Sequence, residues 1–224
     1  MEEDVDAKMH RLKSRPDGGD DPLLLPDGTT LYESLTTKFV NLQGVLQTLA
    51  AEVLSGYVRL LGSGVTGIIL VDGGAVVESL CRADGRLHRG EPAMAALREV
   101  ADREDGVLDI VLLEPDVVDS LHQLVSGKAS PPALHGAWVN APGLLSYLAD
   151  RKWTGSLTVQ STAGSGVIML REGQVTGAYT SHARKLSQEV APVLELCRVP
   201  EALIEVRETV EPRPLEPARP EPDR

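Results

Sequence analysis

The residues that could do chemistry are few, and their spacing is poor for catalysis or metal binding. No two histidines form the H-x-x-x-H or HExxH pairs that hold zinc on a helix. The five histidines of the chain are His10, His88, His122, His135 and His182. Cys81 and Cys197 are far apart and lack a CxxC partner, so we expect two buried, inert thiols. The sequence therefore predicts neither a metal site nor a cofactor.

Two glycine-rich stretches and one serine are the remaining candidates for chemistry. Residues 62–67 read GSGVTG and residues 162–166 read TAGSG. A phosphate-binding loop leads from a strand into a helix and carries a lysine after its last glycine, whereas both stretches connect strands and have no lysine. Ser55 has no visible base, and the G-x-S-x-G nucleophile motif is absent. We predict no catalytic residues, so the chain is not expected to be an enzyme, and a hydrolase is the weakest alternative.

Charge and composition argue against a nucleic-acid-binding protein and against a membrane protein. The chain of 224 residues has a net charge of −11 and no basic cluster, which argues against a nucleic-acid partner. No apolar run approaches the roughly 20 residues of a membrane span, and the polar N-terminus is not a signal peptide, so a cytoplasmic location without membrane contact is expected. Residues 31–126 carry 7 basic and 14 acidic side chains, whereas residues 127–209 carry 8 and 7. Two surfaces of different charge could recognise different partners.

The spacing of apolar residues along the chain predicts its helices and strands. Leu42, Leu46 and Leu49 fall on one face of a helix, and IILVDGGAVVESL (68–80) predicts a hairpin about Asp-Gly. A helix over 90–104, a strand over 106–113 and a helix over 115–127 follow. The pattern then begins again, with a helix around Leu144 to Leu148, a strand, a hairpin over 167–179, a helix in which Pro192 is a kink or the start, and a closing strand.

A repeat with an offset of 99 residues joins the two halves. Glycines coincide in this register, and we assign them to turns and close packing rather than to chemistry. The pairs are Gly44 with Gly143, Gly56 with Gly155, Gly67 with Gly166, and Gly74 with Gly173. The predicted fold class is α+β: two tandem copies of a helix, three antiparallel strands, a helix and a strand. The domains are a disordered tail at 1–30, units at 31–126 and 138–209, a proline-containing linker at 127–137 and a disordered tail at 210–224.

Residues 38–113 and 141–207 resemble the PatA N-terminal (PATAN) domain of bacterial signalling proteins. The second unit matches through WTGSLTV (153–159) and through the hairpin GVIMLREGQVTGAY (166–179), with Ala178 at the small position. It departs after Tyr179, where the usual glycine before the second helix is missing. The first unit matches at Leu46, Leu49, Gly56, Gly67, Gly74, Val76, Gly90, Ala93 and Leu97. The resemblance implies a protein–protein interaction module in bacterial signalling, associated with gliding or pilus-based motility.

Aromatic residues give the candidate interface. Trp138, Trp153 and Tyr179 lie in the near-neutral second unit, and Trp and Tyr are enriched at interface hot spots, although core packing is the alternative. The leading hypothesis is a non-catalytic adaptor that binds protein partners or copies of itself. One alternative is a small-molecule or nucleotide sensor with a pocket between the units. Another is a roadblock-like GTPase regulator, which the count of four strands per unit disfavours.

Overall fold

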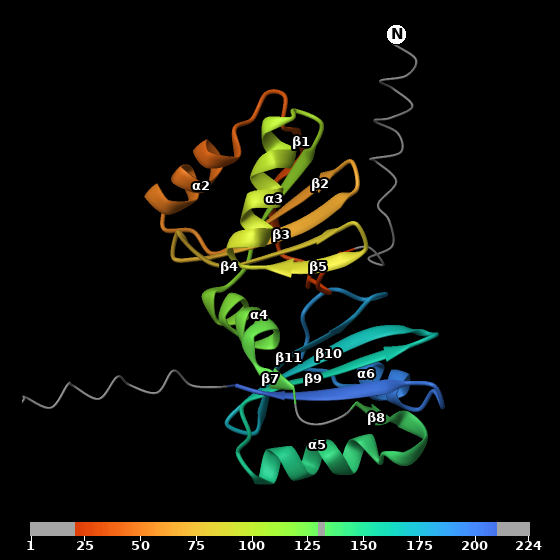
Figure 1. Cartoon of the computed structure of the whole chain (residues 1–224). Coiled ribbons are helices and arrows are strands. Elements are labelled where there is room, and N and C mark those ends of the chain that lie inside the picture. Colours follow the sequence, from red (N-terminus) through yellow and green to blue (C-terminus); the bar gives the residue numbers. More distant parts are fainter. Residues whose placement is uncertain (1–20, 130–132, 210–224) are drawn as a thin grey trace, which may run out of the picture.

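In the described parts of the chain, two antiparallel sheets face each other across one helix, and each sheet has a helix pair on its outer side (Figure 1). The computed structural model describes residues 21–129 and 133–209. Helices and antiparallel sheets are combined in both halves, so the predicted α+β class is confirmed.

The first sheet runs in the order β1-β6-β2-β3-β4-β5. Its helices are α2 (Leu42–Ala51) and α3 (Glu91–Asp102). Asn41 caps α2, because its side-chain oxygen accepts a hydrogen bond from the backbone N–H of Gly44 at 3.2 Å. The strands are β1 (Thr29–Thr36), β2 (Gly56–Gly62), β3 (Val65–Asp72), β4 (Ala75–Ala83), β5 (Arg86–Arg89) and β6 (Val107–Leu112).

The second sheet runs in the order β11-β10-β9-β12-β7, with β8 also paired to β12. Its helices are α5 (Ala141–Asp150) and α6 (Ala191–Cys197), and η1 is a short 3-10 helix (Gly136–Trp138). Asn140 caps α5 in the same way as Asn41 caps α2. Pro192 lies in the first turn of α6, so it marks the start of that helix rather than a kink. The strands are β7 (Lys128–Ala129), β8 (Leu134–His135), β9 (Gly155–Ser161), β10 (Gly164–Arg171), β11 (Gln174–Thr180) and β12 (Leu203–Glu208).

The two sheets share strand order and register at the predicted offset of 99 residues. Gly56 pairs with Val71 on one side and Leu112 on the other, and Gly155 pairs with Leu170 and Glu208 in the same way. Each hairpin also carries a bulge at the equivalent position, between Leu70 and Val71 and between Met169 and Leu170. That both units are copies of one domain stays a prediction.

The hairpin glycines occupy tight turns and close contacts, as the sequence analysis predicted. Gly74 has φ of +82° and Gly173 has φ of +81°, a conformation that L-residues with a side chain rarely adopt. A Cβ on Gly74 would meet the Cα of Ala50 at 2.6 Å, and one on Gly173 would overlap the carbonyl of Ala149. At Gly67 and Gly166 the sheet packs closely on α3 and α6 instead. These glycines therefore dock each sheet against its outer helices.

Two strands are buried on both faces, and this decides the architecture. Residues 67–71 of β3 and residues 166–170 of β10 are all buried. Alternate side chains enter different clusters: Ile69 packs under α2 and α3, whereas Ile68 and Leu70 face the second unit. Val167 and Met169 of β10 join Ile68 and Leu70 in that central cluster. The inner faces of both sheets therefore contribute to one shared core.

Helix α4 (Pro115–Ser126) forms the centre of that shared core. It begins with Pro115 in its first turn and ends at Gly127, as the sequence predicts. Its buried residues Val118, Leu121 and Leu124 contact the inner faces of both sheets, so α4 packs on β2 and β3 as well as on β9. Figure 1 shows this helix between the upper and lower units.

The structure differs from the predicted boundaries in two places. The tail predicted at 1–30 is not disordered over residues 21–30, because Leu25 is buried in the central cluster and β1 begins at Thr29. The linker predicted at 127–137 contributes strands at Lys128–Ala129 and Leu134–His135, both paired with β12. Residues 1–20, 130–132 and 210–224 lie outside the described part.

The strand count was also wrong for the first unit. Its sheet includes β1 and β5 in addition to the predicted four strands. Both are edge strands with mostly exposed side chains, so neither shows the apolar alternation of a half-buried strand. The count had disfavoured a roadblock-like regulator, and that alternative stays a prediction.

Candidate ligand-binding cleft

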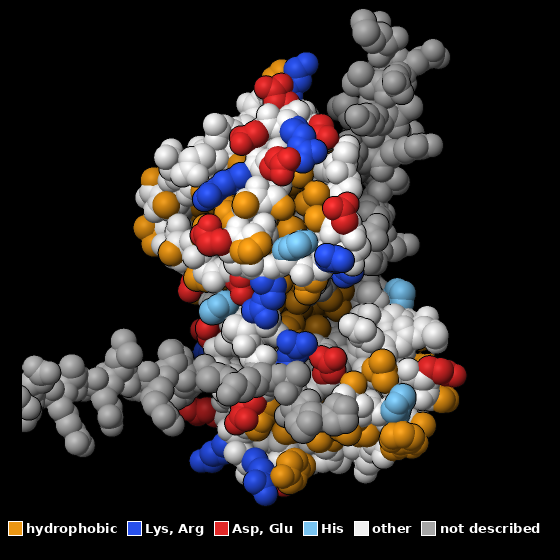
Figure 2. Space-filling view, viewed as in Figure 1, with side chains coloured by type: hydrophobic (Ala, Val, Ile, Leu, Met, Phe, Trp, Pro, Cys, Tyr) orange, Lys and Arg blue, Asp and Glu red, His pale blue; other side chains and the backbone are white. Residues whose placement is uncertain are grey.

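A cleft with a volume of about 410 Å³ opens between the two units. Figure 2 shows it as a hollow at the waist of the molecule, floored by hydrophobic side chains and with Lys or Arg side chains around its rim. Small-molecule sites are clefts of roughly 300 to 1,000 Å³ with an apolar lining and a few polar groups. The cleft has a volume in this range, and its lining combines aliphatic side chains with seven polar or charged ones.

The wall from the first unit alternates leucine and arginine. Leu80 and Arg82 lie two residues apart on β4, and Leu87 and Arg89 lie two apart on β5. Leu80 pairs with Arg89 and Arg82 with Leu87 across the strands, so all four side chains share one face of the sheet. That face is the inner one, because Leu80 also pairs with Ile68 of the central cluster.

The wall from the second unit is more polar. Thr158 of β9 pairs with Val167 of β10 and with Glu205 of β12, and Gln160 pairs with Ser165. Cross-strand partners share a face, so these side chains all belong to the inner face of the second sheet. The remaining sides come from the segment that precedes β1 and from the end of α4, through Pro22, Leu23, Leu24, Leu124 and Val125.

The cleft is basic in an otherwise acidic chain. Arg82, Arg89 and Arg207 line it together with one carboxylate, Glu205, whereas the whole chain carries a net charge of −11. Arg89 is paired with Glu78 at 3.0 Å and Arg207 with Glu205 at 3.1 Å. Within the described residues, Arg82 has no ion pair and no side-chain hydrogen bond. One exposed guanidinium in the lining is thus free to bind an anion.

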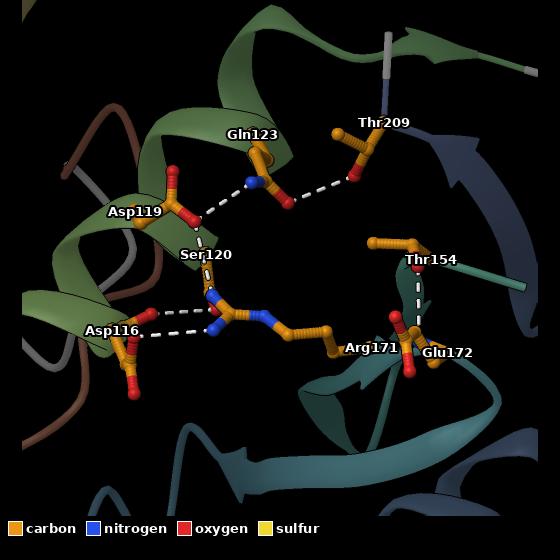
Figure 3. Close-up of polar contacts among 8 residues, drawn as sticks. All are labelled: Asp116, Asp119, Ser120, Gln123, Thr154, Arg171, Glu172 and Thr209. Atoms are coloured by element: carbon orange, nitrogen blue, oxygen red, sulfur yellow. Dashed lines mark hydrogen bonds and ion pairs between the residues drawn. The ribbon is translucent and has the colours of Figure 1, made fainter. Parts of the chain in front are cut away.

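A polar clasp joins α4 to the second sheet (Figure 3). Arg171, at the end of β10, donates to Asp116 at 3.1 Å and to Asp119 at 3.0 Å, so it joins the second sheet to two successive turns of α4. Gln123 donates to the same Asp119 at 2.8 Å and accepts from Thr209 at 2.8 Å. The arrangement holds α4 to the end of β10 and to the residue that follows β12.

The segment before β1 joins the units on the other side. Asp21 accepts a hydrogen bond from Nε of Arg59 at 2.9 Å, and Asp109 lies 3.7 Å from the same guanidinium. The hydroxyl of Tyr179 donates to the carbonyl of Leu24 at 2.8 Å, and the backbone N–H of Asp27 donates to the carbonyl of Arg184. Residues 21–27 therefore contact both units, which the prediction of a disordered tail missed.

Burial sets the acid–base properties of these groups. Desolvation raises the pKa of Asp21 above its usual range, although Arg59 opposes the shift. Desolvation also raises the pKa of Tyr57 to about 12 and raises that of Tyr179 further. Both phenols are therefore neutral at ordinary pH. Tyr57 packs against the central cluster, and Tyr179 is part of that cluster and also donates a hydrogen bond.

The three predicted interface aromatics do not lie together. Trp138 is 81% exposed on η1, with its ring 4.7 Å from that of His135. Trp153 is half-buried and packs against the second unit's own core beside Gly155. Tyr179 is only 3% exposed, so it follows the core-packing alternative: its burial between the units leaves no surface for a partner. Of the three, Trp138 alone is an exposed anchor.

The residues first considered for chemistry have structural roles. Ser55 donates to Asp72 at 2.9 Å and accepts from the N–H of Gly73, so its hydroxyl ties together a turn. Cys81 and Cys197 are both buried, as expected, and burial raises the pKa of Cys81 and raises that of Cys197 to about 11. Across residues 21–129 and 133–209, no group of three or more His, Cys, Asp or Glu side chains is arranged to hold a metal ion.

A second hollow, with a volume of about 440 Å³, lies beside Phe39 at the ends of α2 and α3. Seven of its eleven lining residues are polar, and its charges balance, with Lys38 and Arg98 against Asp102 and Glu104. It lies within the first unit. The cleft between the units is the better candidate because it combines an aliphatic lining with an excess of positive charge.

The fold and the cleft define a class: a two-unit α+β protein with a basic, aliphatic-lined cleft between its units. Among known families, residues 23–125 match one described as an uncharacterized protein conserved in archaea (DUF2226). The match covers β1 to α4, and therefore one wall of the cleft. No curated protein and no solved structure matches the chain.

This family match corrects the earlier resemblance. The PATAN assignment and its bacterial context were wrong, because the matching family is a different one and is described as conserved in archaea. The motility link depended on that resemblance and is withdrawn with it. No helix in the described residues is both long and apolar enough to cross a membrane.

Proposed function

We propose that the protein is a non-catalytic sensor that binds a small molecule in the cleft between its two units. The single observation that carries the proposal is the cleft itself, which has a ligand-sized volume of about 410 Å³ and walls from both units. A ligand held there would contact β4, β5, β9, β10 and β12 at once. Its binding energy would therefore stabilise the two-unit arrangement, and a partner protein could read that change.

The contacts around the cleft support a rigid site. The clasp at Arg171 joins the second sheet to α4, and residues 21–27 join the units through the hydrogen bonds of Tyr179 to Leu24 and of Asp27 to Arg184. A preformed cleft loses less entropy when it binds a ligand than a loose one does. The proposal therefore expects a ligand to raise the unfolding temperature of the full chain.

The test is a thermal-shift screen of the purified full chain with nucleotides, sugars, amino acids and lipids. Native mass spectrometry of the chain as purified from cells shows whether a small molecule stays bound to it. The variant Gln160→Trp fills the cleft from an exposed position on β9, and Thr162→Trp places the same bulk in the adjacent turn, outside the lining. A shift that Gln160→Trp removes and Thr162→Trp retains supports the proposal. A chain that no compound class stabilises, and that carries no small molecule, overturns it.

A second candidate is the adaptor, favoured by Trp138. The indole of Trp138 is 81% exposed beside His135, and Trp is among the residues enriched at interaction hot spots. Light scattering of the full chain, with Trp138→Ala compared with Phe39→Ala, tests it. Phe39 is 82% exposed but lies on the other unit. Loss of an oligomer or of a bound protein with Trp138→Ala alone supports the adaptor, and equal behaviour of both variants contradicts it.

A further inference from the structure

We infer that the ligand of the cleft is an anionic amphiphile, an aliphatic chain with a terminal carboxylate or phosphate, and that Arg82 binds its head group. This inference rests on the proposed function and specifies its ligand. It is carried by the lining side chains, their charges and their positions on the two sheets.

The apolar part of the lining is aliphatic throughout. Leucine and valine side chains come from the segment before β1, from β4 and β5, from α4 and from β10. None of the described lining residues is aromatic, so the cleft offers no platform on which a nucleobase could stack. An alkyl chain needs only such non-directional contact with aliphatic surface. This composition therefore disfavours the nucleotide sensor. The residues are Leu23, Leu24, Leu80, Leu87, Leu124, Val125 and Val167.

The charged part of the lining points to an anion. Arg89 and Arg207 already have carboxylate partners in Glu78 and Glu205. Arg82 has none in the described residues, and it shares its face of the sheet with the aliphatic side chain of Leu87 opposite. A guanidinium binds carboxylate and phosphate oxygens through paired hydrogen bonds. The head group would therefore lie at Arg82 while its chain runs along the leucines.

The polar wall of the second unit supplies the remaining hydrogen bonds. Gln160 and Ser165 are a cross-strand pair on the inner face of the second sheet, and Thr158 lies beside them. Their amide and hydroxyl groups can donate to oxygens of the head group that face away from Arg82. A neutral alcohol would use the same polar wall but leave Arg82 without an anion.

Calorimetric titration of the purified full chain tests the inference with four compounds: dodecanoate and dodecyl phosphate below their critical micelle concentrations, dodecanol below its solubility limit, and AMP. We expect both alkyl anions to bind more tightly than dodecanol and AMP to bind more weakly than either anion. The ratio of dodecanoate to dodecyl phosphate identifies the preferred head group. Within a homologous series of acids, affinity should rise by about fourfold per methylene, the factor that corresponds to burying one CH₂, until the chain outgrows the cleft.

Two matched variants locate the head group. Arg82→Gln should weaken binding of the alkyl anions by about 10- to 100-fold, as expected for the loss of a charge-assisted hydrogen bond, and leave dodecanol binding unchanged. Arg86→Gln removes an equally exposed charge from β5 at a position outside the lining, so it should change neither. Both positions are exposed, and the two variants should unfold at the temperature of the parent chain.

The outcomes separate this inference from the proposed function. Tighter binding of AMP or dodecanol than of the alkyl anions would overturn the inference and leave a ligand-binding cleft intact. Equal effects of Arg82→Gln and Arg86→Gln on dodecanoate would overturn the role of Arg82. If Gln160→Trp also left every affinity unchanged, the compounds would bind elsewhere, and the proposed function would fall as well.

Discussion

Two buried serines should respond in opposite directions to the same substitution. Ser156 is 3% exposed on β9, and its hydroxyl has no hydrogen-bond partner among the described residues. Ser79 is 4% exposed on β4, and its hydroxyl donates to the carbonyl of Gly90 at 2.9 Å. We expect Ser156→Ala to stabilise the protein and Ser79→Ala to destabilise it.

The magnitudes follow from the surroundings of each hydroxyl. A buried hydroxyl without a partner costs about 1 to 3 kcal/mol, and the gap left by one oxygen atom returns part of that, so Ser156→Ala should gain about 1 kcal/mol. Ser79→Ala loses a hydrogen bond, also about 1 kcal/mol. The carbonyl of Gly90 keeps a second partner in the N–H of Met94, which limits the loss. The two variants should therefore differ by about 2 kcal/mol.

Urea denaturation at neutral pH measures this difference directly, and in a chain of this size it corresponds to roughly 4 to 8 °C in unfolding temperature. Both substitutions remove one oxygen from an equally buried strand position, so differences in helix propensity or chain entropy do not enter. The reasoning would be refuted if Ser156→Ala lost as much stability as Ser79→Ala, because the Ser156 hydroxyl would then be bonded in solution.

Three further predictions test the clasp, the turns and the buried phenol. Arg171→Met should cost about 1 kcal/mol at low salt and less at high salt, whereas Arg198→Met, which breaks an exposed pair within α6 and its cap, should cost under about 0.5 kcal/mol in the same urea titrations. Gly173→Ala should cost over about 2 kcal/mol because left-handed strain adds to overlap with backbone, whereas Gly85→Ala, with φ of +73° and open space around it, should cost only about 1 kcal/mol; similar losses would contradict the close approach. Because burial raises the folded pKa of Tyr57 from 10.0 to about 12, its contribution is complete below pH 10 and is lost as pH rises further, so from about pH 9 to about pH 11 the parent chain should lose about 1.4 kcal/mol more stability than Tyr57→Phe.

Much of the outer half of each unit could be predicted from the sequence. The apolar stripe of α2, the Asp-Gly hairpin and the glycine register all depend on contacts within about 60 residues of chain, and each appears at the predicted position. The closing strands were predicted for the same reason. Local period and turn chemistry are sufficient where an element packs on its neighbours in sequence.

The contacts between the units could not be predicted in this way. Residues 21–25 read DPLLL, a composition typical of a loose tether, and Leu25 is nevertheless buried because the second unit covers it. For Tyr179 the sequence left interface and core packing open, and its burial in the central cluster likewise depends on the other unit. The cleft arginines did leave a signal, since Leu80 and Arg82 alternate on β4 and Leu87 and Arg89 on β5, but alternation alone does not say which face is covered.

The dimensions of α4 explain why there is a cleft at all. The five-residue apolar runs of β3 and β10 require cover on both faces, and the outer helices supply cover on only one. A helix of 12 residues is about 18 Å long and 10 to 12 Å wide, whereas the six strands of the first sheet span roughly 29 Å. One helix therefore cannot cover the inner faces of both sheets. Residues 21–27 fill part of the difference, and the space that neither element reaches, over β4, β5, β9 and β10, is the cleft.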